Sequence, residues 1–428
     1  MKFNPFAWGA ILVFYLIPFQ DLGVSFLFLF GFPIVPLKIL LILKELIVII
    51  LGASVVYKKQ ITSARLFLIL FIAYSLISIF FSELPVYNTI LGLRTYLLLL
   101  FSFVLGEQVS TYPFFYDRFM KHLNRVFLLV LCFSILEYFI LPMSIWKFPF
   151  PIMQMKREVA NLATPNEYYD FGYPVNAMGE LTRRMLGPFD EPLYMAYFSI
   201  IMVNFYLVRL INNNGESKYK TILGSVLVLL TQTRAIILGY ILSVAMYLSR
   251  GLKLKVKYVI VVGTVFLLLI PVSFFYIDWL TAFVSSIFDS GGRNKGHIEA
   301  YVVGLKLLLS QPFGSGIGSA SSIVGFSDTN NATENTFINI GLEIGLIGMV
   351  AIFCFFVFLC LQFYSFLLRE KAKSGMPHYL VVASAYLLII QFTFSGLVAP
   401  HILTARILIP FMIVMGWAYG ITKKRNKI

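Results

Sequence analysis

An all-α fold with about twelve membrane-spanning helices is predicted by three features of this sequence. Hydrophobic residues make up 59% of the 428 residues and charged residues only 13%, a balance for which a soluble domain has no use. Apolar runs of spanning length recur along the chain, and lysines and arginines fall in the short loops between them. No hydrophilic stretch is long enough to fold alone, so we expect a single integral membrane domain over 1–428.

The predicted spans run from one end of the chain to the other. The stretch 1–19 is basic and then apolar like a signal peptide, but it lacks a small-x-small cleavage site and is expected to stay in the first helix. The stretch 219–249 is apolar at both ends and polar at 231–234, which predicts two short helices meeting at an outer turn. The remaining runs lie at about 7–30, 36–57, 63–82, 87–108, 122–141, 190–211, 256–276, 344–368, 378–397 and 402–420.

The distribution of basic residues predicts the orientation of these spans. Alternate connections, such as 83–88 and 398–401, carry almost no positive charge. Because basic loops stay in the cytoplasm, the basic set and both termini are expected on the cytoplasmic side. Basic and uncharged loops alternate along the whole chain only if the stretch 219–249 crosses the membrane twice. The basic set comprises Lys2, Lys58, Lys59, Arg65, Arg118, Lys121, Arg125, Arg209, Lys218, Lys220, Arg250, Lys253, Lys255, Lys257, Arg369, Lys371, Lys373 and the tail 423–427.

Two long connections then face the outside, at about 142–188 and 278–333. Both are rich in Phe, Tyr, Pro and Gly, which is not the composition of a disordered segment, so we expect them to contain short helices that pack over the membrane. In the second connection apolar residues repeat at helical spacing over 298–309, and Lys295 and Glu299 are paired at i,i+4. That pattern predicts a helix on the outer interface.

Several classes of function are disfavoured by the same composition. The net charge of +14 does not indicate nucleic-acid binding, because the basic loops form no continuous groove. The cysteines Cys132, Cys354 and Cys360 all lie in apolar runs, where they make neither a disulfide framework nor a metal site. The outer loops contain no Asp-x-Asp, and no histidines have metal-ligand spacing, so neither a metal nor another cofactor is expected.

Arginines on the predicted outer side are the strongest functional signal. A charged side chain near a bilayer is costly and usually marks a substrate path. The planar guanidinium fork suits phosphate and carboxylate, so this side is expected to hold an anionic headgroup. The six arginines are Arg94, Arg183, Arg184, Arg234, Arg293 and Arg406.

The first motif places two arginines before a membrane helix. Arg183 and Arg184 precede a Gly-Pro pair and form a cationic lip, and Asp190 and Glu191 follow near the helix start, where carboxylates favour the helix dipole. The structural alternative is a capped helix with interfacial arginines that snorkel to headgroups.

Two further motifs each present one arginine. Arg234 lies between two apolar helices whose adjacent ends would add backbone donors for an anion; the alternative is a structural arginine that satisfies neighbouring carbonyls. Arg293 follows two glycines and precedes a glycine-rich segment at 312–318, whose backbone amides could approach a phosphate. The segment is not a Walker loop. Lys295 and His297 are weaker candidates for phosphate binding than Arg293.

A carboxylate opens the next predicted helix. Glu334, followed by Asn335, lies at a membrane-helix mouth facing the cationic region, where it could accept a proton from an attacking hydroxyl. The structural alternative is a helix capped by Thr333 with Glu334 in its first turn. Glu343 and the acidic pair of the first motif compete for the role of base.

Arg94 and Arg406 are predicted one or two turns inside membrane helices, near their outer ends. They are expected either to line the same cavity or to pair with carboxylates such as Glu137. Lys44 and Glu45 are interpreted as a structural polar pair.

The order of these motifs resembles the bacterial Wzy-type O-antigen polymerases and their relatives, the O-antigen ligases. The resemblance covers about 180–350 and agrees with the helix plan elsewhere. Its signatures are Arg-x-x-Gly-x-Phe-x-x-Pro from Arg184, Thr-x-Thr-Arg from Thr231, Gly-Arg ending at Arg293, Pro-x-Gly-x-Gly-Ile-Gly from Pro312, and Glu-Asn-x-Phe from Glu334 with a later Glu-x-Gly-x-x-Gly from Glu343.

The resemblance implies a GT-C-like inverting glycosyltransferase at the periplasmic face of the bacterial inner membrane. Its donor would be an oligosaccharide on undecaprenyl pyrophosphate, with no cofactor, and its other partners would be membrane lipids and a chain-length regulator of the Wzz type. Glu334 would be the base, acting with Arg234 and Arg293 as catalytic residues. The expected pyrophosphate-binding residues are Arg94, Arg183, Arg184, Arg234, Arg293 and Arg406.

One departure bears on the choice between relatives. Glu334 stands where ligases commonly show His before Asn, which favours polymerase over ligase. A flippase for lipid-linked oligosaccharides is a further alternative, but it should carry charges through the membrane midplane, whereas these arginines gather on the outer side. An ion-coupled transporter fits less well, because midplane acids are nearly absent apart from Glu45, and a membrane scaffold is the last alternative.

Overall fold

Helices make up all the regular structure that the computed structural model describes. Eight of them are long and apolar enough to cross a membrane, or up to nine if a bent pair counts as one span. The all-α, multi-pass membrane fold is therefore confirmed. The total of about twelve spans stays a prediction, because the span expected at 256–276 lies outside the described residues. These are 4–58, 61–81, 86–141, 149–160, 184–212, 217–249, 293–320, 335–370, 374–397 and 399–425.

Local sequence signals set where the first helices begin and break. Asn4 caps the first helix by accepting a hydrogen bond from the amide of Ala7 at 3.1 Å. The apolar run predicted as one span at 36–57 is two helices bent by 53°. The elements in order are α1 (Pro5–Leu29), α2 (Ile34–Leu41), α3 (Leu43–Lys58), α4 (Ser63–Ile77), η1 (Ser78–Phe81), α5 (Val86–Val109) and α6 (Phe115–Ile135), which runs into the π-helical turn η2 (Leu136–Ile140).

The stretch 219–249 forms two helices, as predicted. They are separated by 231–233, where Gln232 takes a left-handed φ of 52° that reverses the chain. The described middle of the chain contains α7 (Ile152–Ala160), α9 (Pro192–Ile211), α10 (Lys218–Leu230) and α11 (Arg234–Leu248).

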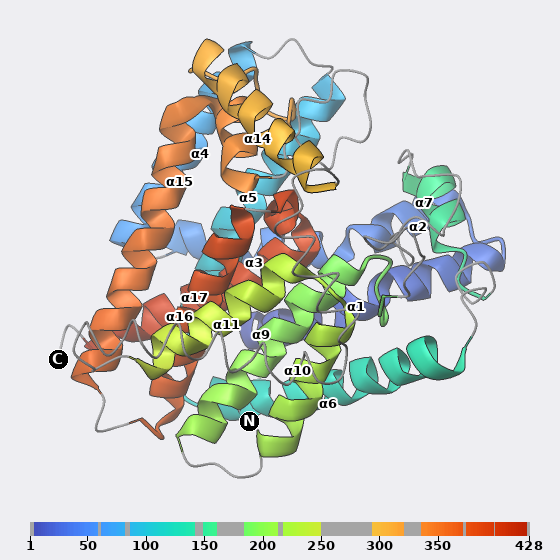
Figure 1. Cartoon of the computed structure of the whole chain (residues 1–428), viewed down its shortest axis with the longest axis vertical. Helices are drawn as coiled ribbons and strands as arrows, with labels where there is room; N and C mark the ends of the chain where they lie inside the picture. The colour runs from blue at the N-terminus through green and yellow to red at the C-terminus, as the bar shows by residue number, and fades with distance from the viewer. Residues whose placement is uncertain are drawn as a thin grey trace.

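The C-terminal part includes the helix expected in the second long connection. It is α14 (Arg293–Ser310), and its Leu308 is buried against Ile338 and Leu342 of the following helix. Figure 1 shows α14 at one end of the molecule and both chain termini in the other half. The remaining elements are α15 (Thr336–Arg369), α16 (Pro377–Gly396), η6 (Pro400–Leu403) and α17 (Ala405–Arg425).

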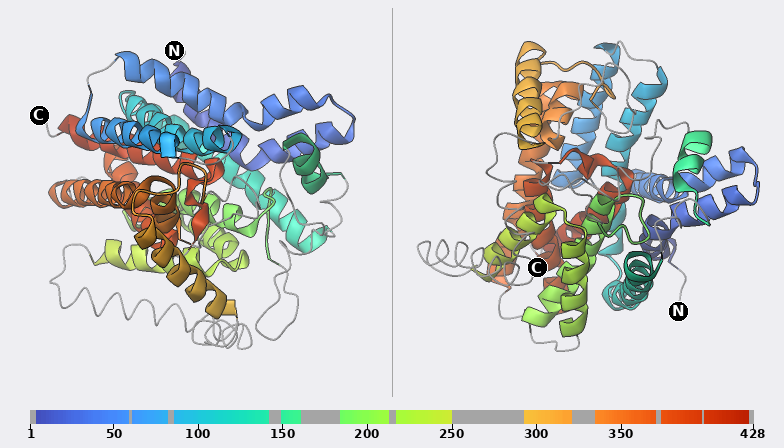
Figure 2. Two further views of the ribbon diagram at one scale, coloured as in Figure 1. Left: turned by 90° about the horizontal axis from the view of Figure 1, so that it is seen from above. Right: turned by 45° about the vertical axis from the view of Figure 1, so that its right-hand side comes forward.

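Close backbone packing places α17 in the middle of the bundle (Figures 1 and 2). A Cβ added to Gly416 would lie 1.9 Å from the carbonyl oxygen of Phe103, and one added to Gly106 would lie 2.1 Å from that of Ile413. Small residues at these positions let α5 and α17 touch along their backbones, as is common between membrane helices. The start of α17, which bears Arg406, is thereby held among the other helices.

Candidate functional site

The segment 184–191, which contains the first motif, is fixed by a buried carboxylate. Glu137 lies in η2, is fully buried, and its Oε2 accepts hydrogen bonds from the amides of Leu186 at 3.3 Å and Gly187 at 3.2 Å. Gly187 has a φ of +57°, and a Cβ there would lie 2.8 Å from the sulfur of Met195. The positive φ and this close contact favour glycine at the turn, which places Arg184 at one end of the segment and Asp190 near the other.

Arg184 joins the first motif to the second. Its Nε donates to the carbonyl oxygen of Thr231 at 2.7 Å, and its Nη2 donates to Oγ1 of Thr233 at 2.9 Å. Thr233 immediately precedes Arg234, whose exposed side chain begins α11. Two arginines 50 positions apart in the sequence are therefore neighbours across one polar turn. These two bonds fix the guanidinium of Arg184 at the turn.

A cluster of alternating charges lies beside this segment, drawn from α1, α7 and α17. Arg406 donates one hydrogen bond to Asp190 and another to Asp21, and its guanidinium lies 5.0 Å from the centre of the Tyr194 ring. Lys156 forms an ion pair with the other carboxylate oxygen of Asp190. Asp190 is 1% exposed. A carboxylate this deeply buried needs its cationic partners, so the cluster locks the 184–191 segment onto three helices.

Burial, with like-charge repulsion from Arg406 as the second cause, lowers the pKa of Lys156 from 10.5 to about 8, and attraction to Asp21 and Glu191 offsets only part of this effect. Between pH 8 and 10.5 the unfolded chain therefore binds more protons at Lys156 than the folded chain does. The buried ammonium lowers the free energy of unfolding by its full amount below pH 8, and this loss becomes smaller as the pH rises from 8 to 10.5.

We therefore expect the thermal midpoint of the wild type to rise relative to that of Lys156→Met between pH 8 and 9.5. The midpoints of both proteins would be followed by intrinsic fluorescence in detergent. A difference that stays constant over this range would contradict the assignment of a depressed pKa to Lys156.

Arg94 is linked to the same charged region through the N-terminal helices. Its Nε lies 3.4 Å from Oε2 of Glu45, which in turn lies 4.0 Å from Nζ of Lys44. Lys44 is within electrostatic range of Asp21 and Arg406. The Lys44–Glu45 pair predicted from the sequence is therefore present, and it connects Arg94 to the cluster.

The partners of Arg94 and Arg406 differ from the carboxylate suggested by the sequence. Glu137 binds the backbone amides of the 184–191 segment, whereas Arg94 pairs with Glu45 and Arg406 with two aspartates. Arg406 also lies nearer the helix end than expected, since α17 begins at Ala405. The reason is that the short 3-10 helix η6 occupies Pro400–Leu403, so α17 begins only at Ala405.

The glycine-rich segment 312–320 is docked on two helices. The carboxylate of Glu343 in α15 accepts a hydrogen bond from the hydroxyl of Tyr96 in α5 at 2.6 Å and also bonds the backbones of Gly318 and Ala320. The glycines permit this approach, since a Cβ on Gly92 of α5 would lie 2.9 Å from the nitrogen of Gly318. Glu343, a competitor for the role of base, thus holds together two of the sequence motifs.

Gly345 is the position at which this docking is most sensitive to substitution. Its φ of +84° and ψ of 170° are essentially reserved for glycine, and a Cβ would lie 2.7 Å from the carbonyl oxygen of Pro312. We expect Gly345→Ala to cost about 1–3 kcal/mol and to release 312–320 to proteases. Limited proteolysis of the protein in detergent measures this. Gly23→Ala, which has open space and no positive φ, is the matched control, and equal cleavage of both variants would contradict the expectation.

The start of α15 corrects one alternative drawn from the sequence. The cap is Asn335, whose Oδ1 accepts from the amides of Phe337 at 2.8 Å and Ile338 at 3.0 Å, so α15 begins at Thr336 and not at Thr333. Glu334 therefore precedes the cap instead of lying in the first turn. Nδ2 of Asn335 also donates to the carbonyl of Leu397 at 3.0 Å, which ties this helix start to the end of α16.

Three predicted residues are not placed by the structure. Arg183 and Glu334 lie outside the described residues, and the side chain of Arg293 does too, although Arg293 begins α14. A pocket of about 380 Å³ at the ends of α5, α16 and α17 contains none of the predicted site residues. The pyrophosphate-binding and catalytic roles of those residues thus stay predictions.

Sequence reasoning missed two members of the charged cluster, Asp21 and Lys156. Asp21 had a usable signal, because it is the one charged residue in α1 and an ionisable group in a membrane helix is a functional candidate. Lys156 had no comparable signal in the sequence, because a lysine in a long connection between membrane helices is common and does not indicate a site. Within the described part of the chain, no group of three or more His, Cys, Asp or Glu residues could hold a metal ion.

Comparison with known protein families adds to this geometry. A family model described as O-antigen ligase matches residues 221–353. This region is similar to O-antigen ligases. It contains Arg234, Arg293, Glu334 and Glu343, and it supports the O-antigen ligase and polymerase superfamily, whose members are membrane glycosyltransferase-like enzymes. A search of curated proteins finds none that matches the chain.

Proposed function

We propose that this protein is an inverting, metal-independent membrane glycosyltransferase that polymerises oligosaccharide repeat units carried on undecaprenyl pyrophosphate. It would act at the periplasmic face of the bacterial inner membrane, with both termini in the cytoplasm, as an O-antigen or capsule polymerase. Its partners would be the lipid-linked oligosaccharides, membrane lipids and a Wzz-type chain-length regulator. The similarity of 221–353 to O-antigen ligases supports the reaction class.

The observation that carries the proposal is the junction between Arg184 and the turn before Arg234. The two hydrogen bonds of Arg184 to this turn, at 2.7 and 2.9 Å, bring two guanidinium-bearing motifs to one place. Arginine offers a planar fork of donors that matches phosphate oxygens. A diphosphate placed at this junction would find cationic donors from both motifs, which suits the departure of a pyrophosphate.

The proposed step is a displacement at the anomeric carbon of the donor sugar. A hydroxyl of the acceptor sugar attacks from the face opposite the pyrophosphate, forming a new glycosidic bond while the bond to the pyrophosphate oxygen breaks. Glu334 takes the proton from the hydroxyl, and Arg184, Arg234 and Arg293 stabilise the charge that grows on the leaving pyrophosphate.

The test is reconstitution of the purified protein with a lipid-linked repeat unit. A ladder of products of increasing length supports polymerase activity. The second candidate, O-antigen ligase, is favoured by the description of the matching family, and transfer only to lipid A core would assign the protein to it. Lipid movement without new glycosidic bonds would indicate a flippase and reject the proposed chemistry.

A further inference from the structure

Three buried polar side chains join the helices α9, α11 and α16, which lie side by side (Figure 1). Nδ2 of Asn204 in α9 donates to Oε1 of Gln391 in α16 at 2.6 Å, and Nε2 of Gln391 donates back to Oδ1 of Asn204 at 3.3 Å. The same Nε2 donates to Oγ of Ser243 in α11 at 2.7 Å. Gln391, Asn204 and Ser243 are all buried and form the amide network.

The amide network lies among apolar contacts in the interior of the helix bundle. Beside it the rings of Tyr197 in α9 and Phe392 in α16 pack with their centres 5.0 Å apart. Apolar contacts alone allow two helices to slide past one another, whereas two reciprocal amide bonds are satisfied in one register only. Polar side chains that bond across membrane helices hold the helices in that arrangement. The amide network therefore selects the register of α9, α11 and α16.

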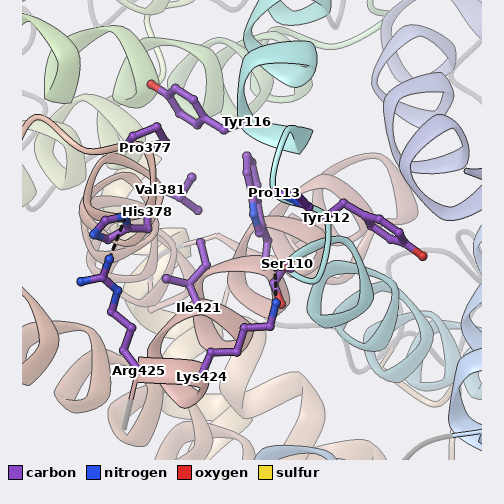
Figure 3. Close-up of a pocket in the computed structure, with 11 residues that line it drawn as sticks. Ser110, Tyr112, Pro113, Tyr116, Pro377, His378, Val381, Ile421, Lys424 and Arg425 are labelled. Carbon is purple, nitrogen blue, oxygen red and sulfur yellow. Dashed lines mark hydrogen bonds between the residues drawn. The ribbon is translucent and has the colours of Figure 1, made fainter. Parts of the chain in front are cut away.

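A bound ligand does not account for these buried amides, since the amide groups of Gln391 and Asn204 bond each other. The pocket at the start of α16, shown in Figure 3, is lined by Pro377, His378 and Val381. At 1.5 Å per residue, Val381 lies about 15 Å along the helix from Gln391. The amide network therefore acts on the helices that it joins.

Each of these helices meets a sequence motif at the same end of the bundle. α9 follows the 184–191 segment directly, and α11 begins at Arg234. The end of α16 bonds the start of α15, because Nδ2 of Asn335 donates to the carbonyl oxygen of Leu397 and Oγ1 of Thr336 donates to that of Ala399 at 2.7 Å. A change of register between the three helices would displace these motifs relative to one another.

We propose that Gln391 is a positioning residue for glycosyl transfer, which acts through Asn204 and Ser243 to hold the 184–191 segment, Arg234 and the start of α15 at one substrate site. This inference rests on the proposed function. A misplacement of about 1 Å, caused by a change far from the reacting atoms, can reduce a rate about 10²-fold. A shift of one residue along a helix is about 1.5 Å, which exceeds that tolerance.

The first test is Gln391→Met in the purified full-length protein, followed by thermal midpoint in detergent and by initial rate with the lipid-linked repeat unit. The change keeps nearly the same shape and leaves the amide of Asn204 buried without its partner, so the midpoint is expected to fall. The rate is expected to fall about 10- to 100-fold. Gln108→Met is the matched control, because Gln108 bonds Tyr112 four positions on at 3.2 Å and joins none of the three helices. It should keep the wild-type rate.

The double variant Asn204→Leu/Gln391→Met separates positioning from stability. Replacing both partners by apolar residues of similar shape removes the unpaired amide, and Ser243 keeps its bond to the carbonyl oxygen of Tyr240 at 2.9 Å. The midpoint is therefore expected to return towards that of the wild type. The rate is expected to stay about 10-fold or more below it, since the register is no longer selected. Recovery of the rate together with the midpoint would overturn the proposal, and this variant decides if Gln391→Met does not fold.

A distance measurement distinguishes failure of this inference from failure of the proposed function. Spin labels at Met246→Cys in α11 and Met376→Cys before α16, both exposed positions, report the register once the three native cysteines are replaced by serine. Electron–electron double resonance should give a distance that shifts or broadens by about 1.5 Å or more in the double variant. Identical distances would overturn the inference. A wild type that makes no product would reject the proposed function, and the distances would still show whether Gln391 sets the register.

Discussion

Arg234→Ala is expected to abolish chain extension in the reconstituted assay while the protein still inserts into membranes. Arg234 begins α11 directly after Thr233, the residue that holds Arg184, so its loss removes a donor from the junction of two motifs. One donor placed on a developing negative charge typically contributes about 3–4 kcal/mol, which corresponds to a rate reduction of about 10²–10³-fold. The side chain is exposed, so truncation leaves no cavity in the core and the fold should be preserved.

The measurement is the length distribution and initial rate of polymer made from a lipid-linked repeat unit. Arg293→Ala should give the same result if its side chain joins the site, whereas Arg234→Lys should retain part of the rate because it keeps the charge and loses the fork. Arg369→Ala is the control, an exposed arginine at the last turn of α15. Polymer of normal length from Arg234→Ala would reject its role in holding the pyrophosphate.

The helices near this site were largely predictable, because their signals are local. The break between α10 and α11 follows from the polar residues 231–234, and α14 follows from the spacing of apolar residues over 298–309. The apolar run predicted to cross the membrane from 344 begins at a break in α15, where Gly345 has a non-helical φ of +84° and ψ of 170° and the amide of Leu346 bonds the carbonyl oxygen of Pro312 at 2.8 Å. The turns before this break, from Thr336, contain the buried polar residues Asn339 and Glu343, which shorten the apolar run in the sequence.

The pairing of charges could not be predicted, because it depends on contacts between residues far apart in the chain. Arg406 bonds Asp21, 385 positions away, and Asp190, 216 positions away. The sequence identified Arg406 and Asp190 as candidates but gave no register between α1 and α17. Such registers depend on packing between helices, as where glycines bring α5 against α17.

Two kinds of arginine environment result from this packing. Arg94 and Arg406 have carboxylate partners, whereas the hydrogen bonds of Arg184 at the turn go to a carbonyl and a hydroxyl. An arginine already paired with carboxylates gains less from a phosphate. The bonds of Arg406 to Asp190 and Asp21 therefore favour a structural role for it, in holding the 184–191 segment against α1 and α17.

Asp190→Asn is expected to destabilise the protein by about 3–5 kcal/mol, the usual cost of removing one partner from a buried ion pair. Asp190 is 1% exposed and binds both Arg406 and Lys156, so an amide of the same shape leaves two cations facing one remaining aspartate, Asp21. The thermal midpoint in detergent should fall, and activity should fall with it because the 184–191 segment loses its attachment.

A double-mutant cycle separates loss of charge balance from loss of shape. Lys156→Met alone leaves Asp190 paired with Arg406 and should cost less than Asp190→Asn. In the double variant one uncompensated cation is gone, so its stability should lie above that of Asp190→Asn alone, with a coupling energy of about 0.5–3 kcal/mol. Additive losses would mean that Lys156 and Asp190 do not interact. A wild-type midpoint in Asp190→Asn would show that the cluster does not hold the segment, and Arg406 would then be free to serve as a pyrophosphate ligand.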